Sequence, residues 1–529
     1  MPPGFSLVRS MAVLRPSRRH VLRAALALAG ASLLPSAARA SPRYRFTGYP
    51  FTLGVASGYP AATAVTLWTR LAPSPLEAAG GMLPESIAVD FEVAEDEAFG
   101  RVVASGTRLA IPERGHAVHV DVEGLAPGRW YFYRFRAGDE VSPVGRTRTA
   151  EVVGTAVQRL RVGVGSCQHY EQGYYAAHRH LAGENLDLML FLGDYIYEAT
   201  WGNALVRRYA GGEARTLGDY RVRYAQHRGD ADLQRLHGQV PWAVLWDDHE
   251  VDNDWAGDQA EHLEPQFLER RTAAFQTFFE HMPLPARMRP AGTGMRIHDT
   301  LVFGDLARIH LLDDRQYRSP QACPDPVKGG GSTDVDPAAC ASLADPTRTM
   351  LGAEQERWLD ASLAASGQRW NLLAQQTLVQ PAAVVTATGQ TVWTDAWDGY
   401  APARQRLLDS LRKRRVANPI FLGGDIHATV AGDLHADPGD VRTPIVASEL
   451  CGTSISSQGN SVLDPAALSA NHPHVRYANT KQRGYLVVEL TPSGMHAQLR
   501  AVDEKRRDSE VTTPAAFTVV AGRPGLQVG

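Results

Sequence analysis

The stretch from Leu186 to Glu198, LDLMLFLGDYIYE, contains the residues best suited to chemistry in this chain. Its apolar run, residues 188–192, stops at Gly193, and so short a run bounded by Gly favours a buried strand over a helix. Asp194 and Tyr197 follow the strand, and ligands of open α/β sheets bind at the carboxyl ends of strands. A carboxylate with a phenol suits a hard, highly charged cation such as ferric iron. A polar turn with a surface Asp is the alternative.

Five further apolar runs after residue 160 also end in residues of the types that bind metals or phosphate. Short apolar runs that alternate with helical patterns predict βα units, so these strand ends would meet at one edge of a sheet. Six such endings along one chain are far from what chance produces. The residues that follow the five runs are Ser166, Cys167 and Gln168; Asp247, Asp248, His249, Glu250, Asp252 and Asn253; Asp313, Asp314 and Arg315; Gln375 and Gln376; and Asp425 and His427.

Two-metal hydrolysis of a phosphate ester requires a set of side chains like this one. Two cations clamp the phosphoryl group and lower the pKa of bound water, so that metal-bound hydroxide attacks phosphorus. A carboxylate must bridge the cations, and Asp194 is central enough to do so. A phenolate and a thiolate favour Fe3+ or a similar ion, whereas carboxylate and amide oxygens favour a hard ion such as Ca2+. Burial of Cys167 as a small hydrophobic residue is the alternative.

Three sequence blocks carry a resemblance to a known superfamily. The GDxxY, GNH(D/E) and GHxH blocks of the calcineurin-like and purple acid phosphatases are matched by Gly193-Asp194-x-x-Tyr197, Asp248-His249-Glu250 and Gly424-Asp425-x-His427. This chain departs from them at Cys167, Asp248 and Asp425, where those enzymes have Asp, Asn and His. With an Arg pair near the N-terminus and the segments WDDHE, LDDRQYRS, TDAWDGY and GTSISS, the departures resemble the PhoD-like alkaline phosphatases and phosphodiesterases. The resemblance runs from about residue 50 to about residue 500.

The resemblance implies two metal sites that share one carboxylate, Asp194. For Fe3+, the implied ligands are Cys167, Asp194, Tyr197 and His427. For Ca2+, the implied ligands are Asp194, Asp248 and Asp425, with Asn253 as a further candidate. Which of Asp247, Asp248 and Asn253 reaches a metal stays open, because the family's motif differs here.

Two residues are candidates for direct action on the substrate. His249 matches a histidine that faces the phosphate or the leaving group in purple acid phosphatases, and acts as an acid or orients another group. Arg315 could contact phosphate through its bidentate fork, or form a buried ion pair with Asp313 or Asp314.

The remaining cysteines and histidines are expected to have structural roles or to lie at the surface. Cys323 and Cys340 flank a loop rich in Gly, Asp and Pro and are a disulfide candidate in an oxidising compartment. Cys451 is expected to pack in the core. Three histidines near a predicted helix are expected at the surface, namely His169, His178 and His180.

The expected fold class is α/β, with four segments along the chain. Residues 1–40 read as a twin-arginine signal, with Arg18-Arg19 before an Ala-rich run and an A-x-A site at residues 38–40. Residues 41–150 alternate like an all-β, fibronectin-III-like sandwich, and residues 158–503 predict a metallophosphatase-type two-sheet α/β sandwich core. Amphipathic patterns predict helices over 351–364 and 401–413, and residues 504–529 are expected to be a loosely ordered tail.

Amino-acid composition and net charge argue against some classes of function. Hydrophobic residues make up 44% and charged residues 21% of the 529 residues, as in ordinary globular proteins. Formal net charge is −3 with six Arg and no acid in residues 1–40, so the remainder is acidic and no nucleic-acid recognition is expected. We expect a periplasmic or secreted monomer without a membrane span after cleavage, whose partners are the twin-arginine export machinery and small phosphate esters.

Three functions from different classes fit the sequence. The first is an exported phosphoesterase that scavenges phosphate from monoesters, diesters or both. The second is a phospholipase D-like or teichoic-acid-type phosphodiesterase with the same site. The third is a non-catalytic exported binding protein, which would require lost ligands, and none is missing from the sequence.

Overall fold

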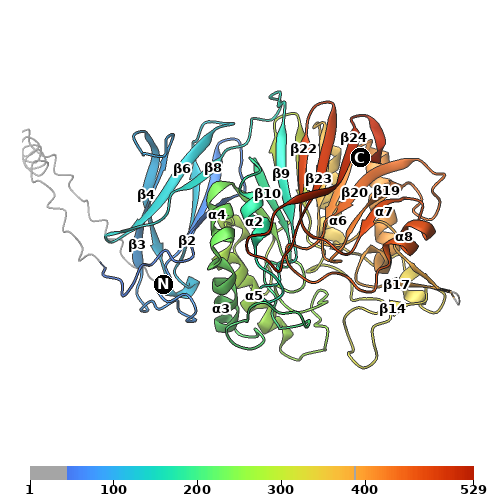
Figure 1. Ribbon diagram of the computed structural model, residues 1–529, viewed down its shortest axis with the longest axis horizontal. Helices are drawn as coiled ribbons and strands as arrows, with labels where there is room; N and C mark the ends of the chain where they lie inside the picture. Colours follow the sequence, from blue (N-terminus) through green and yellow to red (C-terminus); the bar gives the residue numbers. More distant parts are fainter. Residues whose placement is uncertain (1–43, 387–388) are drawn as a thin grey trace, which may run out of the picture. The chain divides into compact units, whose positions relative to one another are not determined.

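The computed structural model describes residues 44–386 and 389–529, and two large β-sheets organise this part of the chain (Figure 1). The predicted signal, residues 1–40, lies outside the described residues. Within them, no helix is long and apolar enough to cross a bilayer. The helices are α2 (Ala176–Leu181), α3 (Leu217–Arg228), α4 (Ala231–Gln239), α5 (Phe267–His281), α6 (Gly352–Ala364), α7 (Ala401–Arg414) and α8 (Pro465–Asn471).

The first sheet has ten strands, and three parallel strands lie at its centre. These are β9 (Leu160–Gly165), β10 (Leu188–Leu192) and β11 (Trp242–Leu245), with all five residues of β10 buried. Such continuous apolar runs are typical of strands covered on both faces. The order across the sheet is β25-β24-β23-β22-β9-β10-β11-β1-β2-β5, where β22 is Arg483–Leu490, β23 Gly494–Val502, β1 Val55–Gly58, β2 Ala64–Arg70 and β5 Ala117–Glu123.

The second sheet has seven strands, and its central strands are also parallel. Leu372 of β15 packs into the buried cluster that includes side chains of the first sheet, whereas Leu373 packs with the cluster that includes α6 and α7. This alternation is the period of a strand with two covered faces. The order is β12 (Asp299–Phe303), β13 (Ala307–Leu311), β15 (Trp370–Ala374), β18 (Pro419–Gly423), β20 (Ile445–Cys451), β19 (Thr429–His435) and β21 (Val475–Asn479).

The expected two-sheet α/β core is therefore confirmed, and so are the two predicted amphipathic helices, which are α6 and α7. Helix α7 begins with a proline in its first turn, where the missing N–H costs nothing, and ends with basic residues in its last turn, which favour the helix dipole. Helix α3 begins with a capping box between Thr216 and Asp219.

Residues 44–150 form the predicted strands, but in two sheets with different neighbours. One sheet is separate and contains β4 (Val102–Ala110), β3 (Ile87–Ala94), β6 (Trp130–Ala137), β7 (Glu140–Val141) and β8 (Gly145–Arg148). Strands β1, β2 and β5 instead continue the ten-stranded sheet, through the pairing of Gly58 with Trp242. The boundary predicted between residues 150 and 158 thus does not separate two sheets.

The prediction of a loosely ordered tail after residue 503 is wrong. Strand β24 (Thr512–Val520) pairs with β23, and β25 (Arg523–Val528) pairs with β24. Ala515, Phe517 and Val519 are buried at every second position, which is the pattern of a strand with one face on the core.

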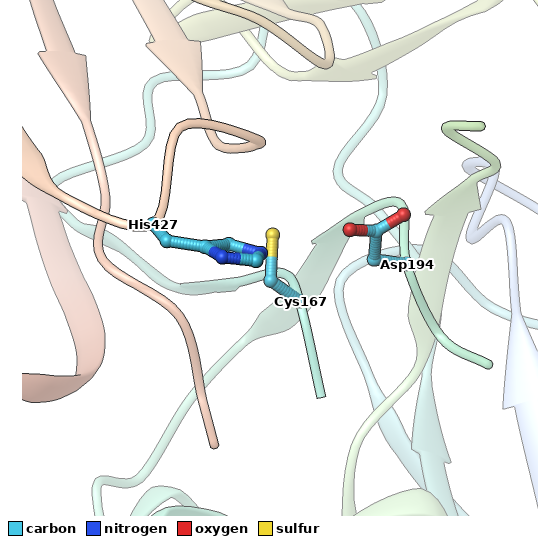
Figure 2. A group of neighbouring side chains, drawn as sticks. All are labelled: Cys167, Asp194 and His427. Atoms are coloured by element: carbon cyan, nitrogen blue, oxygen red, sulfur yellow. The ribbon is translucent and has the colours of Figure 1, made fainter. Parts of the chain in front are cut away.

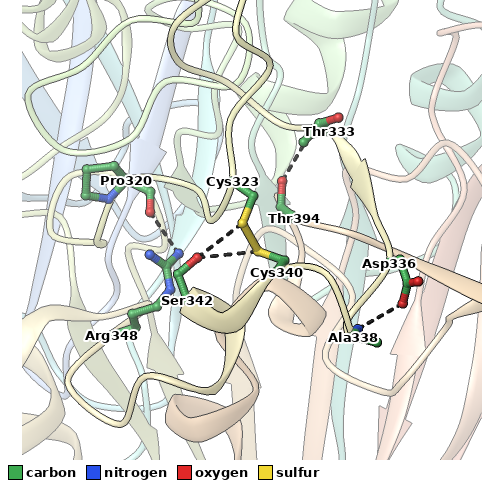
Figure 3. Close-up of a disulfide and its surroundings, with 9 residues drawn as sticks. All are labelled: Pro320, Cys323, Thr333, Asp336, Ala338, Cys340, Ser342, Arg348 and Thr394. Atoms are coloured by element: carbon green, nitrogen blue, oxygen red, sulfur yellow. Dashed lines mark hydrogen bonds between the residues drawn. A yellow bond between two sulfur atoms is a disulfide. The ribbon is translucent and has the colours of Figure 1, made fainter.

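A small third sheet lies beside a disulfide. Its order is β14 (Asp334–Val335), β17 (Gly389–Trp393) and β16 (Val384–Thr386). Cys323 and Cys340 form a disulfide with a Cα–Cα distance of 6.2 Å, and Ser342 lies against both sulfur atoms (Figure 3). The bond closes the loop from which β14 emerges.

Candidate metal centre

The ends of four strands bring the predicted ligands together. Cys167 follows β9, Asp194 follows β10 and Asp248 follows β11, and these three strands are parallel neighbours. His427 comes from the second sheet, after β18. Figure 2 shows Cys167, Asp194 and His427 on three separate segments, with their side chains around one common space.

Ligand atoms of these residues form three overlapping groups, in each of which they lie within 4.8 Å of one another. Asp194 belongs to two groups and Asp248 to two, so the groups form a continuous series. The Tyr197 hydroxyl joins the first group, since it donates to Asp194 Oδ2 at 2.7 Å and lies 3.1 Å from His427 Nε2. The groups are Cys167, Asp194 and His427; Asp194, Asp248 and His249; and Asp247, Asp248 and Asp425.

Four residues of these groups have a left-handed backbone. The φ angles are 57° at Cys167, 57° at Asp194, 64° at Asp425 and 51° at His427. This conformation is uncommon outside Gly, and it concentrates where surrounding structure holds a functional geometry in place. Gly193 is required as well, because a Cβ there would lie 2.4 Å from the Asp247 side chain.

The electrostatics of the site suit added cations. Asp194, Asp247, Asp248 and Asp425 lie in one region, and the first three are buried. Burial raises the pKa of Asp194 and that of Asp425 well above the ordinary range, and it raises the pKa of the Cys167 thiol. Asp194 Oδ1 and Asp247 Oδ2 are buried without a hydrogen-bond partner. Metal ions would supply the positive charge that lets these acids and the thiol ionise, so the donor set fits cations.

Arg315 is fully buried, and carboxylates surround its guanidinium group. Its Nε lies 2.5 Å from Asp247 and its Nη1 2.8 Å from Asp395, while Asp425 is 3.6 Å and Asp248 3.8 Å away. An ion pair is therefore formed, but not with the expected partners. The Arg315 side chain pairs with neither Asp313 nor Asp314. Asp313 instead accepts the Arg315 backbone N–H at 3.1 Å.

His249 is held by a residue that the sequence did not point to. Its Nδ1 lies 2.7 Å from Glu198 Oε2, and its ring lies 4.1 Å from that of Tyr197. Burial lowers the pKa of His249, but Glu198, Asp248 and Asp194 outweigh it and raise that pKa well above the ordinary value. Glu198 also accepts the backbone N–H of Asn253 at 3.2 Å. Its position directly after Tyr197 is the only sequence signal that could have found it.

Polar residues behind the candidate ligands hold the strand ends in place. Glu250 accepts backbone N–H groups from Asp194, Tyr195 and Asp247 at 3.0, 2.6 and 2.8 Å. The Ser457 hydroxyl lies 2.8 Å from both the Tyr197 hydroxyl and the Cys167 carbonyl oxygen. Such supporting residues orient ligands, and no spacing rule in the sequence identifies them.

The prediction for the histidines near α2 is wrong for two of the three. His169 and His178 are fully buried, whereas His180 is partly exposed. The His169 ring lies 4.5 Å from that of Tyr197, and His178 Nε2 lies 2.6 Å from Gln168 Oε1. Hydrogen bonds and tilted or edge-on ring contacts make their burial possible. Cys451 is buried, as expected.

A cavity of about 550 Å³ opens above these groups. Its polar side is lined by Asp194, Asp248, His249, Asn253, Asp425 and His427. Glu198 also lines it, so the His249–Glu198 pair faces the same space as the candidate ligands. The volume is in the range of small-molecule sites.

The fold and the side chains gathered at its strand ends define a phosphate-ester hydrolase with groups of side chains suited to metal ions. The sequence model of the PhoD-like phosphatase family matches residues 162–499, and that of the PhoD-like phosphatase N-terminal domain matches residues 36–151. The chain belongs to the PhoD-like phosphatase family.

Two relatives cover nearly the whole chain. Alkaline phosphatase D of Bacillus subtilis (strain 168) is 39% identical over 530 residues, which covers 96% of this chain and 88% of that protein. A solved structure described as the structure of PhoD matches with a TM-score of 0.86 and 39% identity, over 92% of this chain and 93% of that one. The family, fold class and enzyme class expected from the sequence are thereby confirmed. The role of each site residue stays a prediction.

Proposed function

We propose that this protein is an exported phosphoesterase that uses Fe3+ and Ca2+ to hydrolyse phosphate monoesters, diesters or both for phosphate scavenging. The observation that carries the proposal is the series of donor groups joined by Asp194 and Asp248 on one side of a ligand-sized cavity. The name alkaline phosphatase D, borne by a relative that is 39% identical, supports the same reaction.

The donor chemistry supports an assignment of ligands. Fe3+ would be held by Cys167, Asp194, Tyr197 and His427, because thiolate and phenolate suit a ferric ion. Ca2+ would be held by oxygen atoms of Asp194, Asp248, Asn253 and Asp425. Between the neighbouring aspartates, Asp248 is the better ligand, because it lines the cavity and belongs to two donor groups, whereas Asp247 does not line the cavity and belongs to one. Once bound, the cations would clamp the phosphoryl group and activate water.

The protein's own residues would handle the leaving group. His249 lines the cavity, and Glu198 favours its protonated form, so His249 is suited to donate a proton to the departing oxygen. In this assignment, Arg315 does not contact the phosphate. It is fully buried among carboxylates, so its charge would hold Asp247 and the neighbouring strand ends in place.

The test is to assay purified protein with a monoester and a diester at several pH values, with metal content measured on the same samples. We expect hydrolysis that is lost on chelation and restored by Fe3+ with Ca2+. Hydrolysis of the diester alone would favour the phosphodiesterase alternative. Tight binding of phosphate esters without turnover, at full metal content, would favour a non-catalytic binding protein and contradict the proposal.

Export is proposed to follow the twin-arginine route, which delivers the enzyme to the periplasm or the medium. Arg18-Arg19 precedes an Ala-rich run and an A-x-A site. Changing both arginines to Lys should trap the precursor in the cytoplasm. Normal export of that variant would contradict the route without bearing on the enzyme activity.

A further inference from the structure

The cavity has a second wall that the metal chemistry does not use. Apolar side chains form it, from segments far apart in the sequence. They are Trp201, Leu378, Val384, Trp393, Val462 and Leu463. Trp393 and Val384 come from β17 and β16 of the small third sheet, and both remain partly solvent-exposed, at 45% and 39%. Trp201 stacks on the candidate ligand His427, with ring centroids 5.7 Å apart and an interplanar angle of 5°. The apolar wall therefore begins directly beside the donor groups.

The charged residues beside this apolar wall are carboxylates. None of the residues that line the cavity in the described chain is Lys or Arg. Glu261 and Asp398 line it and are already paired, with Lys328 and Arg404, whereas Asp334 of β14 is exposed at its edge. A second anionic group on a substrate would thus meet the Asp334 carboxylate, which forms no ion pair within the described chain, and no Lys or Arg side chain of the cavity lining. Like charges at close range select against a ligand.

From this wall we infer the substrate class, an inference that rests on the proposed function. The protein acts on phosphate esters whose alcohol group is bulky, apolar and uncharged, and it discriminates against esters that carry a second negative charge. The phosphoryl group lies at the donor groups, and the alcohol group lies against Trp393 and Val384. Aromatic side chains supply much apolar contact area, so Trp393 should provide a large share of the recognition.

The experiment compares phenyl phosphate with 4-carboxyphenyl phosphate, each also as its methyl diester, on metal-loaded protein. The two alcohols are alike in size and differ in charge. We expect kcat/KM to be about tenfold higher for the phenyl esters. Binding of phenylphosphonate and 4-carboxyphenylphosphonate, which are not hydrolysed, should show the same order by calorimetry.

Variants of the protein test which residues produce the preference for phenyl esters. Trp393→Ala should lower kcat/KM for phenyl esters by roughly tenfold. Val385→Ala is the matched control, because Val385 is exposed on the same hairpin and does not line the cavity. Asp334→Lys should reduce the ratio of kcat/KM for phenyl esters to kcat/KM for 4-carboxyphenyl esters. Glu510→Lys changes the net charge equally at an exposed position off this cavity and should leave the preference unchanged.

Two outcomes would overturn different claims. Equal kcat/KM for the phenyl and 4-carboxyphenyl esters, or equal effects of Trp393→Ala and Val385→Ala, would overturn the inference and leave the phosphoesterase proposal intact. If none of the four esters is hydrolysed, the proposed function is overturned. The phosphonate measurement would then still decide whether the wall discriminates by charge.

Discussion

Replacement of Asp194 by Asn tests the centre of the proposed site. Asp194 belongs to both the group with Cys167 and His427 and the group with Asp248 and His249. The amide oxygen of Asn can still accept the Tyr197 hydroxyl, which lies 2.7 Å from Asp194 Oδ2, so the shape is kept. What is lost is the negative charge that two cations would share.

The expected magnitudes differ between activity and stability. Loss of one transition-state interaction typically lowers the rate by about 10²–10³, and loss of a bridge should exceed that, so we expect more than about 10³-fold, or about 4 kcal/mol. Metal at 100 times its Kd stabilises the folded protein by about 2.7 kcal/mol, and Asp194→Asn should lose this gain. Without metal, Asn should not destabilise, because burial already disfavours the Asp194 charge.

The assay combines metal content, kcat/KM and thermal unfolding with and without metal. Asp313→Asn is the matched control. Asp313 is also buried after a strand of the core, and it accepts hydrogen bonds from Trp246 Nε1 and the Gln316 backbone but belongs to no donor group. The Asp313→Asn variant should lose stability and keep both metals. Asp187, directly before β10, is a poorer control, because its carboxylate forms an ion pair with Arg148.

Retention of both metals and most activity by Asp194→Asn would refute the reasoning, and Asp247 or Asp248 would become the better candidate for the bridge. An equal loss of metal in Asp313→Asn would also count against it, since the effect would then come from general damage to the strand ends.

Three further predictions follow from the same geometry. Cys167→Ser should weaken iron binding and shift the visible absorption expected of a phenolate–iron pair, because a neutral hydroxyl replaces a thiolate; an unchanged spectrum with full iron content would contradict this. Glu198→Gln should lower the pKa of His249, whose protonated form Glu198 favours, so the alkaline limb of kcat/KM should move to lower pH in a pH–rate series. A limb that stays in place would exclude His249 as the acid. Replacing both Cys323 and Cys340 by Ser should reduce the melting temperature and raise KM for phenyl esters more than for methyl phosphate, because their loop carries β14 against the strand that presents Trp393; KM values that change equally would contradict this link.

The candidate ligands could be predicted because their signal is local. An apolar run that stops at Asp194 or Asp425 reports both a buried strand and the polar residue at its end. Parallel pairing then brings such ends together, as the register of Leu192 with Leu245 does for β10 and β11. The alternation of β24 is also present in the sequence, but alternation alone does not reveal the partner strand, β23, that orders this segment.

The partners of Arg315 and His249 could not be predicted in this way. Asp395 lies 80 residues from Arg315 along the chain and meets it only through the fold. Burial of His169 and His178 could not be predicted for the same reason. The His169 backbone N–H donates to Ser457, 288 residues away, and the His178 ring lies 6.3 Å from that of Trp242 in β11.

The pairing of β22 with β9 has a consequence for how the chain folds during synthesis. Strand β9 leads directly to Cys167, yet its neighbour in the sheet, β22, comes from residues 483–490. Contacts this distant in sequence slow folding. At about 5–20 residues per second, β9 would wait on the order of tens of seconds for its partner, with an unpaired edge open to aggregation. The loop that holds Cys167 also meets Ser457, so a nascent chain cannot assemble this site before nearly all of it has left the ribosome.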